Sequence, residues 1–292
     1  MKHDVIIIGG SYSGMAAALQ LLRARRRVLI VDAGQRRNRF ASHSHGFLGQ
    51  DGVDPAVIWA GAREQLLRYP TLTWIEGTAA EAGGAMDAFH VVLEDASRHE
   101  GRRLLLATGV RDDLPGIPGL AERWGRSVFQ CPYCHGYELE MGRIGVIAVC
   151  PMSLHQAQML PEWGKVTLLA NGAVQPDESI RADLAARGVG IEEVPVAALE
   201  GEADVRLTDG RLLSFAGLFT ASRAMPGPLA ERLGCALGEN PLGQQIQISE
   251  TKETTVPGVF ACGDVAKAPH SVSLAVGDGA WAGAQLHRSL VF

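Results

Sequence analysis

The sequence predicts an α/β protein built around parallel sheets. Short apolar runs of strand length alternate with longer runs of helical periodicity along the 292 residues. The apolar runs are continuous rather than alternating, as in "DVIII" at residues 4–8. Such runs are typical of strands that are buried on both faces of a parallel sheet.

The first part of the chain predicts a βαβ unit followed by further strands. Good helix formers with helical spacing predict helices at 13–26 and 56–69. Strands are expected at 4–10, 27–34, 72–79, 89–95 and 102–109. The last two strands are expected to form a small sheet that leads back to the main one.

A proline- and glycine-rich stretch, "LPGIPGL" at residues 114–120, predicts a hinge before a second unit. The elements expected in that unit are strands at 142–149 and 165–172, a strand pair at 203–215, and helices at 153–160 and 177–188. Near residue 246 the pattern changes again. A strand at 256–265 and a helix at 274–290 complete the expected alternation.

The composition excludes several classes of function. The net charge of −5 argues against a nucleic-acid-binding surface, and no apolar run is long enough to span a membrane. The start of the chain lacks the features of a signal peptide, so we expect a cytoplasmic protein. Five cysteines are too few for a disulfide scaffold, and in the cytoplasm most of them are expected to be thiols.

A glycine-rich turn between the first strand and the first helix predicts a nucleotide ligand. Gly9, Ser11 and Gly14 match the Gly-x-Gly-x-x-Gly fingerprint, except that Ser11 replaces the middle glycine. Ser11 is small enough for a pyrophosphate to approach the backbone and the N-terminus of the helix. Asp32 follows about twenty residues later, where a carboxylate binds ribose hydroxyls and disfavours a 2′-phosphate. The turn therefore predicts FAD or NAD, with a tight turn that holds no ligand as the alternative.

The stretch "CPYCHGYE", residues 131–138, is compatible with a redox dithiol, half of a zinc site or a haem attachment point. A zinc site needs four ligands, and Cys150 and Cys235 are isolated in the sequence. Covalent c-type haem usually accompanies export, for which we find no signal. The residues therefore favour a redox dithiol formed by Cys131 and Cys134, with an inert structural pair as the alternative and no metal site.

Three further segments carry a resemblance to a known family. They are "IIGGSYSG" at 7–14, "LLLATGVRDDLPGIPG" at 104–119 and "VPGVFACGDVAKA" at 256–268. Together with the central Cys-x-x-Cys, they resemble the low-molecular-weight thioredoxin reductase family of two-domain flavoproteins over nearly the whole chain. The stretch "CPYCHGYE" more closely resembles one branch of the family, the dithiol oxidases similar to those of gliotoxin and holomycin biosynthesis, in which a histidine follows the second cysteine. The common thioredoxin reductases have an aspartate at that place.

The resemblance implies two Rossmann-like domains, each a three-layer ββα arrangement. Residues 1–113 and 246–292 would form an FAD-binding domain. Residues 114–245 would form a second domain that carries the Cys-x-x-Cys pair on a remnant of an NADPH-binding fold. A homodimer is expected on the same ground.

The resemblance also implies how FAD is held. The first segment would bind the pyrophosphate, and Gly263 and Asp264 would bind the ribitol. Ser271 and Val272 would lie at the pyrimidine edge of the flavin, although "HSV" stands where the family usually has Arg-Gln-Ala. The full set of expected FAD-binding residues is Gly9, Ser11, Gly14, Asp32, Asn38, His45, Gln50, Thr108, Gly109, Gly263, Asp264, Ser271 and Val272.

The polar segment after the second strand contributes three members of that set. His45 and Gln50 would hydrogen-bond flavin or substrate, with a plain surface loop as the alternative. Asn38 would contact FAD, whereas Arg37 and its neighbouring arginines are expected to form a solvated basic turn.

The expected second domain lacks the features of an NADPH site. The positions that should be glycine hold Ala148, Cys150 and Ser153, whose side chains keep a backbone from closing on phosphates. A 2′-phosphate needs arginines after the next strand, and "LLANGAVQPDES" contains neither arginine nor lysine. We expect that this domain has lost its nucleotide, with an unusual nucleotide loop as the alternative.

These features predict an FAD-dependent thiol–disulfide oxidoreductase. The resemblance implies that Cys131 exchanges with substrate and that Cys134 faces the flavin, and we expect His135 to handle the protons. The substrate would be a small dithiol or disulfide or a thioredoxin-like protein. The other partner would be O2, which makes the enzyme a dithiol oxidase, or a protein electron donor. The alternatives are an NADPH-dependent thioredoxin or disulfide reductase and a flavin-bound redox sensor without turnover.

Overall fold

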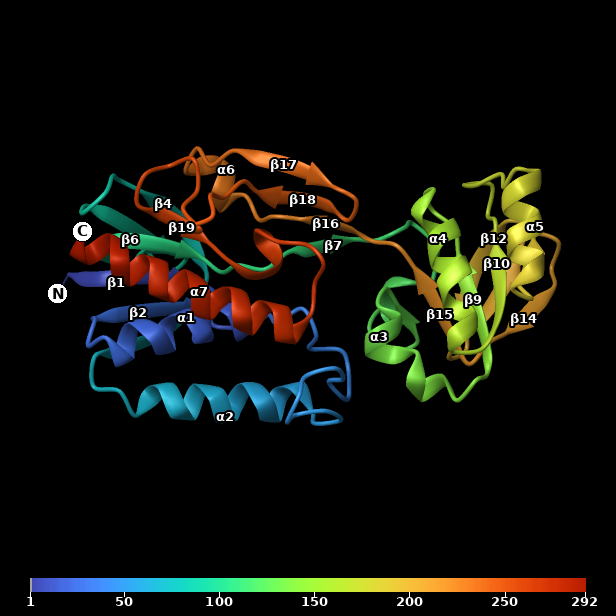
Figure 1. Ribbon diagram of the computed structural model, residues 1–292, viewed down its shortest axis with the longest axis horizontal. Helices are drawn as coiled ribbons and strands as arrows, with labels where there is room; N and C mark the ends of the chain where they lie inside the picture. The colour runs from blue at the N-terminus through green and yellow to red at the C-terminus, as the bar shows by residue number, and fades with distance from the viewer. Residues whose placement is uncertain (1) are drawn as a thin grey trace. The chain divides into compact units, whose positions relative to one another are not determined.

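The computed structural model describes residues 2–292, which divide into two compact units (Figure 1). Unit 1 contains the residues up to Arg39 together with Gly46–Asp112 and Ala224–Phe292. Unit 2 contains Phe40–His45 and Asp113–Arg223. Each unit combines a mainly parallel sheet with helices, which confirms the predicted α/β class with two Rossmann-like domains.

Unit 1 is built on a seven-stranded sheet. Its strands are β1 (His3–Ile8), β2 (Val28–Asp32), β3 (Leu72–Glu76), β4 (Ala79–Gly83), β5 (Phe89–Leu93), β6 (Arg98–Leu106) and β19 (Val259–Ala261). They run in the order β3-β2-β1-β6-β5-β4, and β19 pairs with β6. The strands β3, β2, β1, β6 and β19 are parallel, and β5 and β4 are antiparallel additions. Strand β2 is buried over its whole length, as its continuous apolar run predicts.

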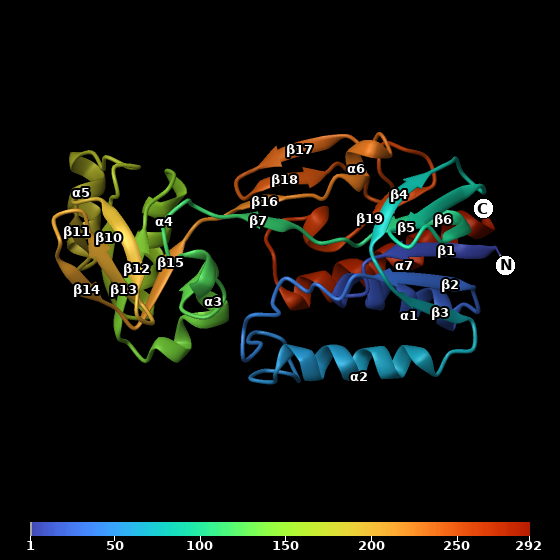
Figure 2. The same ribbon diagram turned by 180° about the vertical axis from the view of Figure 1, so that it is seen from behind.

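Helices α1 (Tyr12–Arg23) and α7 (Val272–Val291) lie side by side in unit 1, whereas α2 (Pro55–Leu67) lies apart from α7 (Figures 1 and 2). Two glycines of α7 permit the close approach of α7 to α1. A Cβ atom at Gly279 would lie 2.1 Å from the carbonyl oxygen of Ser13, and one at Gly283 would lie 2.5 Å from that of Ala17. The two helices share one hydrophobic core with β1 and β2.

A second, four-stranded sheet has the order β17-β18-β16-β7. Its members are β7 (Arg111–Asp113), β16 (Arg223–Met225), β17 (Leu237–Asn240) and β18 (Gly243–Ile246), and the short helix α6 (Leu229–Arg232) precedes β17. The sequence places the second domain boundary at residue 246, whereas the contacts group residues 224–245 with unit 1. The physical reason is that this segment packs on the core of unit 1, where Ala230 and Cys235 share a hydrophobic cluster with Ile6 of β1.

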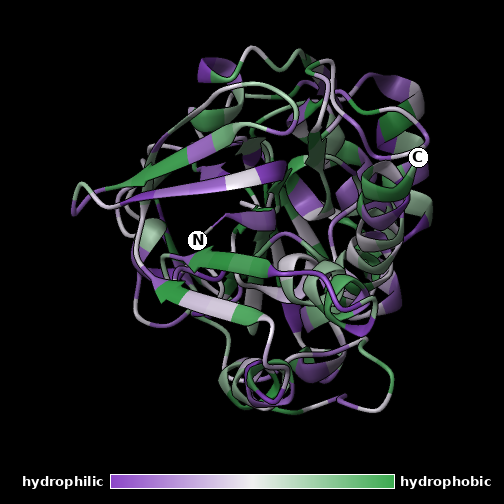
Figure 3. Ribbon diagram, turned by 90° about the vertical axis from the view of Figure 1, so that its left-hand side faces the viewer, coloured by the Kyte–Doolittle hydropathy of each residue, from purple (hydrophilic) through white to green (hydrophobic). Residues whose placement is uncertain are grey.

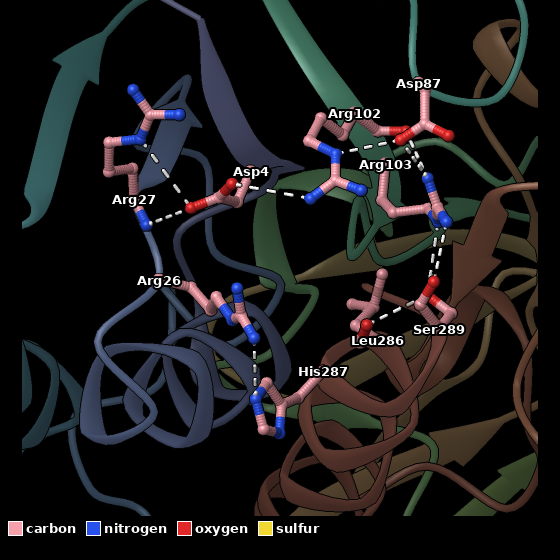
Figure 4. Close-up of polar contacts among 9 residues, drawn as sticks. All are labelled: Asp4, Arg26, Arg27, Asp87, Arg102, Arg103, Leu286, His287 and Ser289. Atoms are coloured by element: carbon pink, nitrogen blue, oxygen red, sulfur yellow. Dashed lines mark hydrogen bonds and ion pairs between the residues drawn. The ribbon is translucent and has the colours of Figure 1, made fainter. Parts of the chain in front are cut away.

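Arginines secure the end of unit 1 at which β1 starts (Figure 4). Arg103 of β6 is 5% exposed and donates to the carbonyl oxygen of Ser289 in the last turn of α7 at 2.6 Å. The same guanidinium donates to Asp87 Oδ1 at 2.9 Å. The last carbonyl groups of a helix have no partner within the helix, so Arg103 caps α7 and ties it to the sheet.

Unit 2 is built on a five-stranded parallel sheet with the order β11-β10-β9-β15-β8. Its strands are β8 (Val128–Phe129), β9 (Arg143–Ile147), β10 (Lys165–Leu169), β11 (Gly190–Glu192) and β15 (Gly217–Thr220). An antiparallel meander consists of β12 (Val196–Glu200), β13 (Asp204–Leu207) and β14 (Leu212–Ser214). The helices are α3 (Pro132–His135), α4 (Met152–Met159) and α5 (Glu178–Ala186).

Two hydrophobic clusters cover the two faces of the five-stranded sheet. Val146 of β9 packs in one cluster with Ala157 of α4 and Leu184 of α5. Ile147, the next residue of β9, packs in the other cluster with Val205 of the meander. Neighbouring residues of a strand point to opposite faces, so the sheet separates the helices from the meander in a three-layer ββα arrangement.

Helix α7, which runs toward the C label in Figure 3, carries both hydrophilic and hydrophobic residues along its length. Its buried positions lie on the face toward α1, as Gly279 and Gly283 show.

Within residues 2–292, no helix combines the length and the apolar character that crossing a bilayer requires.

Candidate functional site

The turn between β1 and α1 requires the glycines of the fingerprint. Gly9 has a φ of +109°, and a Cβ atom there would lie 2.2 Å from the carbonyl oxygen of Ala107. A Cβ atom at Gly14 would lie 1.9 Å from the carbonyl oxygen of Gly9. Ser11 is the N-cap of α1, and within the described chain its side chain makes no capping hydrogen bond. The first N–H groups of α1 are therefore available to an anionic group.

Asp32 ends β2 beside this turn and is 9% exposed. Its Oδ1 accepts a hydrogen bond from the backbone N–H of Gly10 at 3.1 Å. A Cβ atom at Gly10 would lie 2.7 Å from the Trp74 ring, and Trp59 Nε1 donates to the carbonyl oxygen of Gly10 at 2.8 Å. Two tryptophans and a carboxylate therefore fix the backbone of the turn.

Several buried side-chain polar atoms have no hydrogen-bond partner among residues 2–292. Among them are Asn38 Oδ1 and Trp74 Nε1, which lie near the turn. Asn38 Nδ2 donates to the hydroxyl of Tyr12 in the first turn of α1 at 3.2 Å, and burial raises the pKa of that hydroxyl. Buried polar groups are rarely left unsatisfied. The orphaned acceptor and donor, together with the glycine turn, fit a polar ligand such as a flavin dinucleotide.

The turn formed by Gly263 and Asp264 follows β19. Gly263 has a φ of +75°, and its N–H donates to Asp278 Oδ2 of α7 at 2.9 Å. Asp264 Oδ2 accepts from Arg37 Nη1 at 3.0 Å. Asp278 and Arg37 thus fix the two residues of this expected ribitol site in place.

Arg37 is not a solvated residue, so that expectation was wrong. Its Nε and Nη2 donate to the two carboxylate oxygens of Asp112 at 2.9 and 2.6 Å, and Nη1 lies 2.6 Å from His270 Nδ1. Burial opposes the charge, but the carboxylates of Asp112 and Asp264 raise the pKa of the guanidinium above its usual value. Arg37 therefore provides the positive charge between these two carboxylates.

The other expected FAD residues of unit 1 come from three further segments of the chain. Thr108 and Gly109 follow β6, and no atom lies within 4 Å of a Cβ atom built at Gly109. Ser271 is the N-cap of α7, where its hydroxyl accepts from the N–H of Leu274 at 3.1 Å, and Val272 is the first residue of that helix. Gln50 is exposed. The hydroxyl of Ser271 thus has a structural role that the sequence analysis missed.

Cys131 and Cys134 form a disulfide in unit 2, with a Cα–Cα distance of 5.3 Å. Cys131 is the N-cap of α3, and Pro132 is its first residue. Both cysteines are partly exposed. Tyr133 between them is 73% exposed and meets the Trp163 ring edge-on at a centroid distance of 5.4 Å. The residue pattern therefore produces a disulfide that solvent can reach.

His135 lies directly after this pair and stacks on the Phe129 ring at a centroid distance of 4.3 Å. Burial, with a smaller contribution from the charge of His45, lowers the pKa of His135 to about 4. His45 belongs to unit 2, where its Nε2 lies 3.4 Å from Glu138 Oε1. At neutral pH the imidazole of His135 is therefore uncharged, and its lowered pKa makes it a weak base while the cysteine pair is a disulfide.

The other three cysteines do not form a second pair. Burial raises the pKa of Cys262 to about 12, and burial also raises that of Cys235. Cys150 is partly exposed and is not bonded to another cysteine. In residues 2–292, no group of three or more histidine, cysteine or acidic side chains is arranged to hold a metal ion.

The turn after β9 is closed by its own side chain. Ser153 is fully buried, and its Oγ accepts from the backbone N–H of Val149 at 3.1 Å. The N–H of Ser153 donates to the carbonyl oxygen of Cys150 at 2.9 Å. Beyond β10, Asn171 Oδ1 accepts from the N–H of Val196 at 2.9 Å. The polar groups at these two strand ends thus have partners within unit 2.

The fold and the disulfide define a two-unit α/β disulfide oxidoreductase. The sequence matches the family model described as pyridine nucleotide-disulphide oxidoreductase over residues 3–279, so the chain belongs to this family. This confirms the predicted flavoprotein and oxidoreductase class, of thioredoxin reductase-like type.

Three relatives illustrate this similarity. An oxidoreductase from Agrobacterium tumefaciens has a crystal structure with a TM-score of 0.98 and 56% identity, over 100% of this chain and 99% of that one. The crystal structure of HlmI has a TM-score of 0.90 and 35% identity, over 99% of this chain and 93% of that one. Thioredoxin reductase tcpT from Claviceps purpurea (strain 20.1) is 34% identical over 309 residues, which cover 99% of this chain and 94% of tcpT.

Proposed function

We propose that this protein is an FAD-dependent dithiol oxidase that uses the Cys131–Cys134 disulfide. The observation that carries the proposal is the closed turn after β9. The Oγ of Ser153 accepts a hydrogen bond from the backbone N–H of Val149. A pyridine nucleotide would need a glycine-lined backbone with free N–H groups at this place. A flavoprotein that does not take electrons from such a nucleotide needs another partner, and O2 is the simplest acceptor.

Unit 1 would hold the FAD. The uncapped start of α1 would receive the pyrophosphate, and Asp32 would bind the ribose hydroxyls. Asp264 would bind the ribitol while Arg37 fixes its carboxylate. The orphaned Asn38 Oδ1 would accept a hydrogen bond from the cofactor. The remaining expected contacts from unit 1 are Gly9, Ser11, Gly14, Gln50, Thr108, Gly109, Gly263, Ser271 and Val272, and His45 is the one expected contact from unit 2.

The dithiol reaction proceeds through two exchange steps at the cysteine pair. A substrate thiolate attacks Sγ of Cys131, the Cys131–Cys134 bond breaks, and Cys134 leaves as a thiolate. The second substrate sulfur then attacks the sulfur bound to Cys131, which releases an oxidised substrate and leaves the pair reduced. His135 starts uncharged and is a weak base. The thiolate formed at Cys134 would raise the pKa of His135, so that the imidazole takes up the substrate proton as the pair is reduced.

Bound FAD would supply the oxidation of the reduced pair, taking two electrons and passing them to O2. The sum of the steps is substrate dithiol plus O2 giving substrate disulfide plus hydrogen peroxide, so atoms and electrons balance. The substrate class is a small dithiol, because the partly exposed pair needs no protein partner to be reached. A thioredoxin-like protein is the alternative that the test includes.

The test is an anaerobic flavin titration. The purified yellow protein is mixed in separate cuvettes with NADPH, with dithiothreitol and with reduced thioredoxin, and dithionite provides full reduction as the control. We expect dithiothreitol to bleach the flavin, NADPH to leave it oxidised, and air to restore the colour with formation of peroxide. Prompt bleaching by NADPH would identify a conventional reductase and overturn the proposal. Bleaching by thioredoxin but not by dithiothreitol would replace the small dithiol with a protein substrate.

A further inference from the structure

A buried ion pair lies beside the Gly263–Asp264 turn and takes no part in the dithiol chemistry. Lys252 Nζ lies 2.5 Å from Asp278 Oδ1. The two residues are 9% and 6% exposed. Lys252 is in the loop between β18 and β19, and Asp278 is in α7. Burying two charges is costly, so a buried ion pair is weak evidence of a stabilising role, and its other contacts indicate what it does.

The two oxygens of Asp278 have different partners. Oδ1 accepts from Lys252, and Oδ2 accepts from the backbone N–H of Gly263 at 2.9 Å. Gly263 has a φ of +75°, a conformation that a residue with a side chain rarely adopts. The carboxylate of Asp278 thus fixes the backbone N–H of Gly263. The backbone conformation of Gly263 in turn sets the direction in which the chain continues into Asp264.

The turn has little freedom to move. A Cβ atom at Gly263 would lie 2.5 Å from Ser13 Oγ, and one at Gly279 would lie 2.1 Å from the Ser13 carbonyl oxygen. Ser13 is in the first turn of α1, so α1, α7 and the Gly263 turn meet at this residue. A shift of the turn would therefore disturb the expected pyrophosphate site at the start of α1 as well as the expected ribitol site at Asp264.

Lys252 is itself held in place by the backbone. Its N–H donates to the carbonyl oxygen of Ser249, and its carbonyl oxygen accepts from the N–H of Ala261 in β19, both at 3.0 Å. The neighbouring thiol of Cys262 is fully buried, and burial, together with the charge of Asp278, raises its pKa to about 12. Lys252 thus places a positive charge against Oδ1 of Asp278, and hydrogen bonds between charged groups are stronger than those between neutral ones.

We propose that Asp278 and Lys252 are positioning residues for the flavin site, because they hold the Gly263–Asp264 turn in its binding conformation. The inference rests on the proposed FAD site of unit 1. Neither residue belongs to the expected FAD contacts, and Asp278 reaches that set through its hydrogen bond with the Gly263 N–H. What matters in this arrangement is the acceptor for the Gly263 N–H, and the charge of Lys252 serves to maintain it.

Two double variants separate the acceptor from the charge. Lys252→Met with Asp278→Asn removes both charges and keeps an oxygen for the Gly263 N–H. Lys252→Met with Asp278→Leu also removes both charges but leaves that N–H without a partner. Apo-proteins are prepared from the full chain, their folding is checked by circular dichroism and thermal melting, and FAD is titrated by the quenching of its fluorescence.

We expect the asparagine variant to bind FAD within a few-fold of the unmodified chain and the leucine variant to bind at least about tenfold more weakly. Equal affinity of the two variants would overturn the proposal, because the acceptor would then have no effect on the cofactor. If the leucine variant does not fold, Asp278→Glu replaces it, since it keeps the ion pair but displaces the acceptor by one methylene. A glutamate variant with unchanged affinity would overturn the proposal in the same way.

The unmodified apo-protein distinguishes this inference from the proposed function. If it binds no FAD, the FAD site fails and the positioning role fails with it. If it binds FAD and the matched variants do not differ, only the positioning role fails.

Discussion

At the scale of single residues, His135 has an unusual titration range. Burial and the charge of His45 lower its pKa from the ordinary value of 6.5 to about 4 in the folded protein. Between these two values the unfolded chain binds a proton that the folded protein does not. The contribution of His135 to the free energy of unfolding is therefore complete above pH 6.5 and is lost as the pH falls toward 4.

The variant His135→Phe tests this titration. Phenylalanine keeps an aromatic ring against Phe129 but cannot titrate. We expect the urea midpoint of the unmodified protein to fall more steeply than that of the variant between pH 7 and about pH 5. The two midpoints should run in parallel between pH 7.5 and 8.5, where His135 is neutral in both states. Parallel curves over the whole range would contradict the burial of an uncharged imidazole.

Residue types and spacing predicted the glycine fingerprint, Asp32 and the cysteine pair, because each of these features is local in sequence. They did not predict the partners of Arg37. Its carboxylates, Asp112 and Asp264, come from distant parts of the chain, and only the tertiary fold brings them together. The same is true of Lys252 and Asp278, since a lone lysine and a lone aspartate carry no signal of burial in a sequence.

At the scale of elements, two of the three glycines of α7, Gly277 and Gly279, have opposite surroundings. Gly279 faces Ser13 at a distance that leaves no room for a Cβ atom, whereas no atom lies within 4 Å of a Cβ atom at Gly277. Gly277→Ala should therefore stabilise the protein by up to about 1 kcal/mol, because alanine is the better helix former. Gly279→Ala should destabilise it by about 1–3 kcal/mol through overpacking.

Thermal melting of these two variants checks the expected order. The melting temperature should rise or stay level for Gly277→Ala and fall for Gly279→Ala. A rise for both variants would show that α7 is free to move away from α1.

The elements that the sequence analysis missed are short or polar. Strand β15 (Gly217–Thr220) lies between β9 and β8 in the sheet of unit 2, but four residues are too few to show a periodicity. Strands β17 and β18 contain mostly polar or small residues, "LGEN" and "GQQI", and their pairing depends on their neighbours. The long helices and the buried parallel strands were predicted because their patterns are strong.

At the scale of the whole molecule, the expected FAD residues and the cysteine pair belong to different units. Apart from His45, the residues expected to bind FAD belong to unit 1, whereas Cys131 and Cys134 belong to unit 2. The double variant Cys131→Ser with Cys134→Ser should therefore keep the yellow flavin spectrum. It should lose at least about a hundredfold in the rate at which a dithiol bleaches the flavin, since no exchange partner remains.

Stopped-flow absorbance under anaerobic conditions measures this rate, and bleaching by dithionite should be unchanged in the variant. A variant that purifies without flavin would show that the cysteine pair contributes to cofactor binding. A variant that dithiothreitol still bleaches at the original rate would remove the pair from the reaction path.

The packing of α1 against α7 also bears on biosynthesis. Residues 12–23 and 272–291 become neighbours only after the segment between them has been made, so the core that they share is a late event during translation. Most of unit 2, residues 113–223, is contiguous and leaves the ribosome earlier. We therefore expect the cysteine-bearing unit to fold on the nascent chain, whereas a cofactor can be captured in unit 1 only once α7 has been synthesised.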